Sequence, residues 1–267
     1  MRDWCPPVLL RWLREIICRR EIVFEGDFST WNEASARCSG YDTQEILTKV
    51  LDATLKVSRG EAAFERDSVL FKKIEYEWPV LSGLMLGAAR NDGKLNVLDF
   101  GGALGSSFFQ NRYFLKTLRE VRWSVVEQAH YVEAGQLYLH NEQLRFYKSI
   151  DNCFTENKPN VILLSSVLQY LPEPRSTLLS ICNAGADIII IDRTIVNNSY
   201  SDRAYVQHVP PSIYLASYPC WSLSEHSLLS IAIDKYEVIG SFKSLPFPAL
   251  SFIDSEFKGY ILKRILQ

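Results

Sequence analysis

The chain has few of the residues that mark metal and disulfide sites. It holds four histidines and six cysteines in 267 residues, and no two cysteines form a Cys-x-x-Cys pair. This spacing offers no zinc-site signature and favours reduced, buried thiols over a disulfide framework. We therefore expect no metal and a cytoplasmic protein. The cysteines are Cys5, Cys18, Cys38, Cys153, Cys182 and Cys220.

An excess of charge and a long uninterrupted apolar run are also missing. The net charge is −2, so no overall basic field indicates a nucleic-acid partner. Arginines interrupt the apolar residues of 1–20, which excludes a signal-peptide core or a membrane span there. Pro6 and Pro7 precede apolar residues at helical spacing, which predicts a basic amphipathic helix. Such a helix either packs on the protein's own surface or makes weak contact with a membrane surface.

Helical spacing dominates the first third of the chain. Ser29 or Thr30 with Glu33 resembles a capping box. Residues 60–86 continue the helical period, and Pro79 is expected to break this run into two helices. We therefore expect residues 1–90 to form a helical extension or cap on the main domain.

From Leu95 onward, apolar strands alternate with helices. Continuous Val, Ile and Leu runs between helices predict a parallel sheet that is covered on both faces. Two further strands near the C-terminus close the sheet as an antiparallel pair, and residues 197–221 are expected to form a long irregular loop. The expected fold of residues 91–267 is thus α/β, with a doubly wound, mostly parallel, seven-stranded sheet. The strands are expected at 95–100, 122–127, 144–147, 160–166, 187–192, 236–241 and 258–265.

A glycine-rich turn follows the first of these strands. Asp99 ends the apolar run, Gly101, Gly102 and Gly105 follow it, and Ser106 opens a helix. Glycines let a ligand lie against bare backbone, and an acid that ends the next strand, here Glu127, can accept hydrogen bonds from a ribose diol. This logic suits both NAD and S-adenosylmethionine. The turn is not Gly-x-Gly-x-x-Gly, and Asp99 would repel a pyrophosphate, so the sequence favours the methyl donor.

Four stretches in order resemble the motifs of class I S-adenosylmethionine-dependent methyltransferases. They are Val97–Gly105, Val126–Glu127, Ser149–Asp151 and Val161–Pro172. From Trp31 to the C-terminus the chain is also similar to a family of methyltransferases from bacterial surface-polysaccharide gene clusters. That second resemblance is carried by Gly60–Phe71, Phe109–Arg112, Ile191–Thr194 and Val206–Tyr214.

The resemblance implies a role for each matching residue. The three glycines would lie against the methionine and ribose of S-adenosylmethionine, and Glu127 would hold the ribose hydroxyls. Asp99 would anchor the loop or the donor's ammonium group through water. Asp151 would bind the adenine amino group, and Ser165 or Ser166 would line the methionine side.

The acceptor side is less defined. His208 is a candidate general base, because an imidazole titrates near working pH, and a structural histidine is the equal alternative. Asp192 and Arg193 either orient an acceptor or form a buried pair. Aromatic residues of the expected loop either wall a sugar or aromatic substrate or simply pack the loop; they are Tyr214, Tyr218 and Trp221.

The sequence predicts methyl transfer to a small-molecule acceptor, such as a sugar of a surface glycan. Two other functions fit a similar architecture. One is a nicotinamide-dependent oxidoreductase, and the other is a catalytically silent scaffold with a methyltransferase fold.

Overall fold

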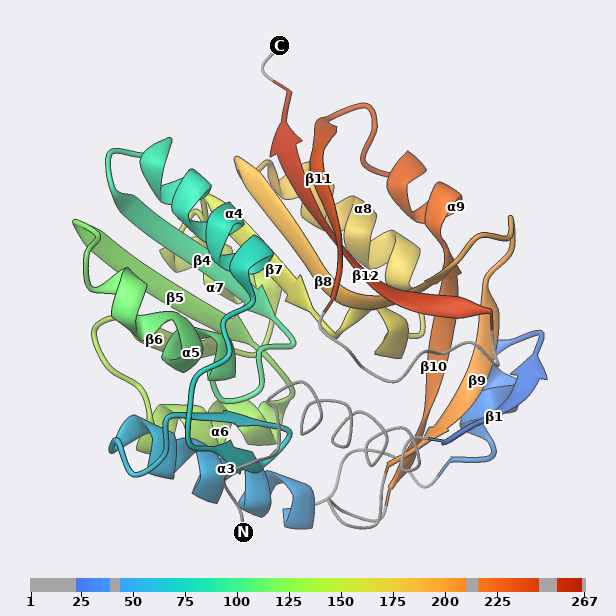
Figure 1. Cartoon of the computed structure of the whole chain (residues 1–267), viewed down its shortest axis with the longest axis horizontal. Helices are drawn as coiled ribbons and strands as arrows, with labels where there is room; N and C mark the ends of the chain where they lie inside the picture. Colours follow the sequence, from blue (N-terminus) through green and yellow to red (C-terminus); the bar gives the residue numbers. More distant parts are fainter. Residues whose placement is uncertain (1–22, 39–43, 210–215, 245–253, 266–267) are drawn as a thin grey trace, which may run out of the picture.

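A seven-stranded sheet forms the centre of the protein, in a computed structural model that describes residues 23–38, 44–209, 216–244 and 254–265. Five neighbouring strands are parallel, while the sixth, β12, runs antiparallel to both of its neighbours (Figure 1). This arrangement confirms the predicted fold class. In spatial order the strands are β6 (Leu144–Tyr147), β5 (Glu120–Val126), β4 (Lys94–Phe100), β7 (Val161–Ser165), β8 (Ile188–Asn197), β12 (Ser255–Arg264) and β11 (Tyr236–Lys243).

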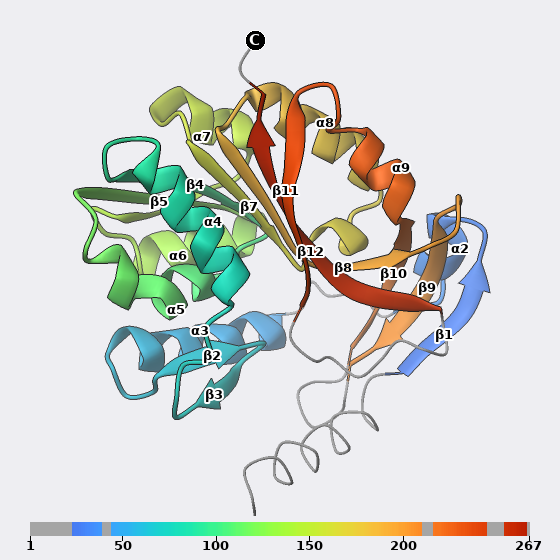
Figure 2. The same ribbon diagram turned by 45° about the horizontal axis from the view of Figure 1, so that its top comes forward.

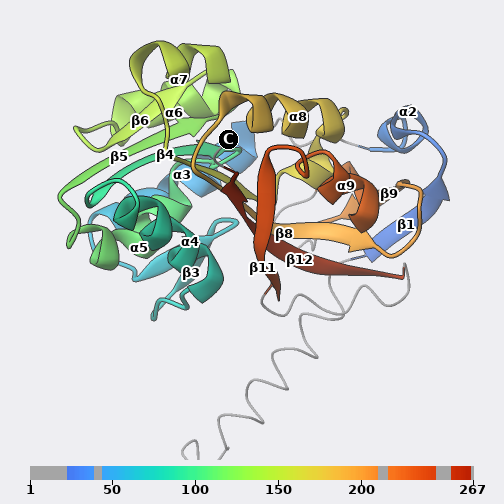
Figure 3. The same ribbon diagram turned by 90° about the horizontal axis from the view of Figure 1, so that it is seen from above.

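Helices cover both faces of this sheet because successive strand residues point to opposite sides. Val97 packs in one core cluster and Leu98 in the other, and both are fully buried. Figure 3 shows α4 and α5 on one face and α7 and α8 on the other. The first cluster includes residues of α3 (Gln44–Ser58), α4 (Trp78–Ala89), α5 (Ser106–Leu115) and α6 (Ala129–Tyr138). The second includes residues of α7 (Ile150–Glu156), α8 (Pro174–Ala184) and α9 (Glu225–Ser230).

Three further strands extend the sheet beyond β8, and they correct the expected loop at 197–221. β9 (Arg203–His208) lies between β1 (Val23–Phe28) and β10 (Ser217–Ser224) and is antiparallel to both. β10 joins β8 through only two residue pairs, Leu223 with Val196 and Ser224 with Asn197. Pro219 lies within β10 and has no N–H to donate to a neighbouring strand. It is accommodated because β10 pairs there with β9 alone.

The segment before β4 also differs from the helical prediction. Residues 64–71 form a hairpin of β2 (Phe64–Arg66) and β3 (Val69–Phe71) instead of a helix. Asp67 and Ser68 form its two-residue turn, with φ of 51° and 67°. Two positive φ angles are typical of a tight hairpin turn, although neither residue is the usual glycine. In Figure 2 the hairpin lies beside α3. Pro79 sits in the first turn of α4 instead of separating two helices.

The structure tests neither the predicted helix of residues 1–20 nor the division of the chain near residue 90. In the part of the chain that the structure describes, no helix has the length and hydropathy needed to cross a membrane. The predicted amphipathic helix of residues 1–20 lies outside the described residues. The division of the chain near residue 90 stays a prediction.

Candidate active site

The glycine-rich turn connects β4 to α5 and closes against neighbouring strands. The N–H of Gly101 donates to the carbonyl of Val126 at 2.9 Å, which ties the turn to the end of β5. Gly101 has φ of 73°, and a Cβ there would lie 2.5 Å from Cγ2 of Val167. Gly105 has φ of 89° and caps α5. Both positions therefore require glycine, because their φ angles are positive and a Cβ would crowd neighbouring side chains.

Asp99 lies beneath this turn and not on its open side. Its side chain is 1% exposed, and the indole Nε1 of Trp123 donates to Oδ2 at 2.9 Å. A Cβ on Gly102 would lie 2.5 Å from Cγ of this carboxyl group. Burial raises the pKa of Asp99, the hydrogen bond from Trp123 lowers it and the nearby charge of Glu127 adds to the rise, which together bring it to about 7. The geometry fits the loop-anchoring alternative of the sequence prediction.

Glu127 stands at the end of β5, next to the turn. The N–H of Gln128 donates to its Oε2 at 2.6 Å. Burial raises the pKa of Glu127, while the N–H groups of Gln128 and Ala103 lower it, which places this carboxylate beside the backbone of the turn. β5 and β7 flank β4 on opposite sides, so the turn lies where the winding of the sheet reverses. Ligands of open α/β sheets bind in the crevice at this point.

A second cluster of polar side chains lies where the end of β7 meets the middle of β8. Ser165 Oγ donates to Oδ2 of Asp192 at 2.6 Å, and Arg193 Nη2 donates to Ser165 Oγ at 3.0 Å. Arg193 Nε lies 3.3 Å from Oδ2 of Asp192, so the two residues form a largely buried ion pair. Arg193 has φ of 49°, and its backbone is held by Ser244 and Gln169. A strained non-glycine residue held from several sides is typical of functional sites.

The hairpin of β2 and β3 contributes residues next to the glycine-rich turn to which the sequence analysis gave no role. Ser106, the first residue of α5, donates its hydroxyl to Oε1 of Glu65, and burial raises the pKa of Glu65 to about 7. Arg66 Nη2 donates to Oε1 of Glu77 at 2.7 Å. The signals in the sequence were the charged run Glu65-Arg66-Asp67 and its place within residues 60–71, which carry the second family resemblance. Its meaning depends on the hairpin, which the helical prediction had excluded.

Several predicted residues lie apart from this edge. His208 pairs with Glu25 at 3.0 Å, and alternation along β9 directs it to the face opposite Gln207. Trp221 stacks on Trp31, with ring centroids 5.7 Å apart. A role for either residue stays a prediction that its position does not favour.

The remaining predicted residues have mixed placements. Tyr218 lies on the same side of β9 and β10 as Gln207, whose amide donates to the Tyr218 hydroxyl at 3.1 Å. Asp151 is exposed in the first turn of α7, just after the end of β6. Ser166 has φ of 56° and lies at the end of β7. Tyr214 lies outside the described residues. Within the described ranges, no cluster of three or more His, Cys, Asp or Glu side chains could hold a metal ion.

Burial of Asp99 and Glu65 predicts that stability depends on pH. Both carboxyl groups hold their protons more tightly in the folded state, because their pKa rises from 3.8 and 4.5 to about 7. The free energy of unfolding should therefore fall as pH rises from about 4 to about 7, by at most about 1.4 kcal/mol per pH unit and group.

Replacement of Asp99 by asparagine tests this. Urea unfolding of Asp99→Asn across this range should show a shallower fall than that of the wild type. Asp52→Asn, on the exposed side of α3, should keep the wild-type slope. An unchanged slope for Asp99→Asn would contradict the raised pKa.

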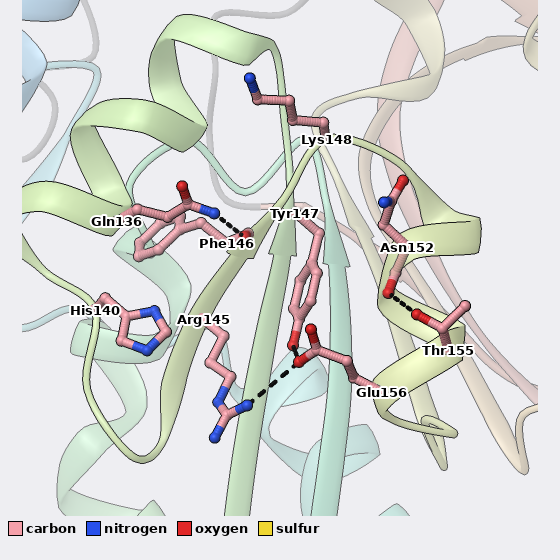
Figure 4. Close-up of a pocket in the computed structure, with 9 residues that line it drawn as sticks. All are labelled: Gln136, His140, Arg145, Phe146, Tyr147, Lys148, Asn152, Thr155 and Glu156. Carbon is pink, nitrogen blue, oxygen red and sulfur yellow. Dashed lines mark hydrogen bonds and ion pairs between the residues drawn. The ribbon is translucent and has the colours of Figure 1, made fainter.

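A separate cavity lies along the edge strand β6, between α6 and α7 (Figure 4). Tyr147 and Arg145 both reach Glu156 there, with distances of 2.8 Å and 3.3 Å to Oε2. None of the lining residues belongs to the predicted site. They are Gln136, His140, Arg145, Phe146, Tyr147, Lys148, Asn152, Thr155 and Glu156.

Comparison with known proteins finds similarity only among solved structures. No protein-family model and no curated protein matches the chain. The N-terminal domain of EvdMO1, solved with S-adenosylhomocysteine and D-fucose, is 15% identical, covers 85% of this chain and 98% of its own, and has a TM-score of 0.49. An S-adenosylmethionine-dependent methyltransferase from Clostridium acetobutylicum ATCC 824 is 11% identical over 81% of this chain and 98% of its own, with a TM-score of 0.48.

A third structure has a similar score. The N-methyltransferase NodS from Bradyrhizobium japonicum WM9, in complex with S-adenosylhomocysteine, is 12% identical. It covers 71% of this chain and 87% of its own, with a TM-score of 0.44. Identities and TM-scores this low carry no argument about function, which must come from the residues of this chain.

Proposed function

We propose that this protein transfers a methyl group from S-adenosylmethionine to a small-molecule acceptor. The observation that carries the proposal is the position of Glu127, at the end of β5 and beside the backbone of the glycine-rich turn. A carboxylate at this point accepts hydrogen bonds from both hydroxyls of a ribose. When bound, S-adenosylmethionine supplies an electrophilic methyl group on a sulfonium cation.

The acids around the turn favour this donor over NAD. Glu65, Asp99 and Glu127 come from three different elements and lie at or beneath the turn. Glu127, together with the ionised fraction of Glu65 and Asp99, would repel a pyrophosphate and attract a sulfonium or ammonium group. The NAD-dependent alternative therefore has the weaker support.

The same proposal gives further predicted site residues a role in binding the donor or the acceptor. Gly101, Gly102 and Gly105 provide the backbone surface under the methionine and ribose. Ser165 and Ser166 line the methionine side of the donor. Asp151, in the first turn of α7, lies where the adenine ring of the donor would be. Asp192 and Arg193 hold each other in place and orient the acceptor. Methyl transfer depends mainly on this positioning, because the donor is already activated.

A turnover assay tests the proposal. The protein is incubated with S-adenosylmethionine and a panel of sugars, amines and phenols, and S-adenosylhomocysteine is measured by mass spectrometry. We expect product with at least one acceptor, and none with the Gly102→Ala variant, whose extra methyl group would disturb the turn. Product at equal rates from both proteins would contradict the proposed site.

A further inference from the structure

Four aromatic rings form one continuous cluster at the surface, where the start of α4 meets α5. Tyr76 contacts Trp78 and Phe114, with ring centroids 5.3 Å and 5.1 Å apart. Phe114 in turn contacts Trp78 at 5.9 Å and Tyr113 at 5.4 Å. Trp78 is 60% exposed and Tyr113 is 69% exposed, so this aromatic cluster presents two large rings to the surroundings of the protein.

The neighbouring hairpin adds exposed aliphatic and aromatic side chains. All three residues of β3 (Val69–Phe71) are exposed, by 42%, 41% and 38%. Arg66 pairs with the first residue of β3 across the hairpin and donates to Glu77, which directly precedes Trp78. Figure 3 shows β3, α4 and α5 on the same side of the sheet. Apolar side chains gathered on one exposed face are typical of an interaction surface.

Positive charge accompanies this apolar surface. Residues 67–78 and 110–119, which carry it, hold five lysines and arginines against three acids, and one of these acids, Glu77, is paired with Arg66. The whole chain has a net charge of −2, so this excess is local. Among the described residues, none of the five cations forms an ion pair, whereas Lys49 and Lys56 of α3 both do. The five are Lys72, Lys73, Arg112, Lys116 and Arg119.

Charge and composition together indicate the partner. A second copy of this surface is disfavoured, because two positively charged faces repel each other. A single-stranded nucleic acid would use the rings and the cations, but the exposed aliphatic side chains of β3 would gain nothing from it. Trp and Tyr rings favour the headgroup layer of a bilayer, aliphatic side chains favour its acyl boundary, and lysines are attracted by anionic headgroups. An anionic bilayer therefore matches all three features of the surface.

We propose that the aromatic cluster and β3 together form a docking surface for an anionic lipid bilayer. Trp78 and Tyr113 enter the headgroup layer, and the lysines beside them contact lipid phosphates. Few side chains take part, so the contact is peripheral and reversible. This surface is separate from residues 1–20, and the inference does not depend on the proposed function.

Vesicle co-sedimentation of the full chain tests the proposal. One set of vesicles contains phosphatidylcholine alone, and the other contains phosphatidylcholine mixed with phosphatidylglycerol. We expect binding to the mixed vesicles, which added salt weakens because it screens the surface charges. Trp78→Ala combined with Tyr113→Ala should weaken this binding at least about tenfold, because both rings lose their contact with the headgroup layer. Tyr200→Ala, at an 85% exposed ring elsewhere, should bind as the wild type does.

Charge reversal provides a second pair of variants that leaves the rings in place. A lysine near an anionic surface strengthens binding about fivefold, so Lys72→Glu combined with Lys73→Glu should weaken it more than about twentyfold. Lys148→Glu combined with Lys158→Glu makes the same change in net charge. These two lysines flank α7, on the opposite face of the sheet, and this control should retain binding. Thermal unfolding shows whether each variant folds.

Three results would overturn the inference. The first is an absence of binding to the mixed vesicles. The second is wild-type binding by both the ring variant and the charge variant, which would assign the contact to another segment, such as residues 1–20. The third is binding of an oligo-uridylate that the ring variant loses, with no binding to vesicles, which would assign the surface to a nucleic acid.

Discussion

Replacement of Glu127 by alanine is expected to weaken the binding of S-adenosylhomocysteine about a hundredfold. The carboxylate would accept two hydrogen bonds from the ribose, and hydrogen bonds to charged groups contribute about 1.5–3 kcal/mol each. A factor of 100 corresponds to about 2.8 kcal/mol, just below the smallest value of that sum, about 3 kcal/mol. Calorimetric titration of the variant beside the wild type measures the difference.

A matched control lies on the same strand. Glu120 begins β5, at the end opposite to Glu127, and its side chain is 42% exposed in an ion pair with Arg122. Glu120→Ala should bind S-adenosylhomocysteine as the wild type does. Equal losses in the two variants would point to a general effect on β5 and would remove the assigned role of Glu127.

Replacement of Gly102 by alanine is expected to abolish measurable binding and to lower stability by about 1–3 kcal/mol. The new Cβ would lie 2.5 Å from Cγ of Asp99 and 2.6 Å from its Oδ2. This carboxyl group cannot move away freely, because Trp123 Nε1 holds it and its side chain is buried. The turn itself must shift, which displaces the backbone that would lie against the donor. Urea unfolding and calorimetric titration measure the two effects.

Gly240 provides the comparison for this variant. A Cβ there would meet Ile261 at 3.7 Å, which is ordinary van der Waals contact. Gly240→Ala in β11 should therefore fold and bind normally. If Gly102→Ala also binds normally, the close packing of Asp99 against the turn does not control the site.

Regular local patterns explain what could be predicted from the sequence. The strand at Ile188–Ile191 is apolar at every position because helices cover both of its faces, and this run predicted a buried parallel strand. Gly101 and Glu127 could be expected together because parallel strands end at one edge of the sheet. The sequence of the turn and of the second strand therefore predicted this half of the proposed site.

The other half depends on pairings between segments far apart in sequence. β1 and β9 are far apart in the sequence, and their pairing places Glu25 beside His208. Asp67 and Ser68 form a hairpin turn without the usual Asn-Gly, so no local signal predicted the hairpin or the ion pair of Arg66 with Glu77. Such contacts arise from tertiary packing, which local periodicity does not encode.

The most direct measurement of the central claim is calorimetric titration of the wild-type protein with S-adenosylhomocysteine and, separately, with NAD. The account predicts one S-adenosylhomocysteine bound per chain and no heat from NAD. Binding of NAD in preference to S-adenosylhomocysteine would contradict it, because the acids around the glycine-rich turn would then accommodate the pyrophosphate that they are expected to repel.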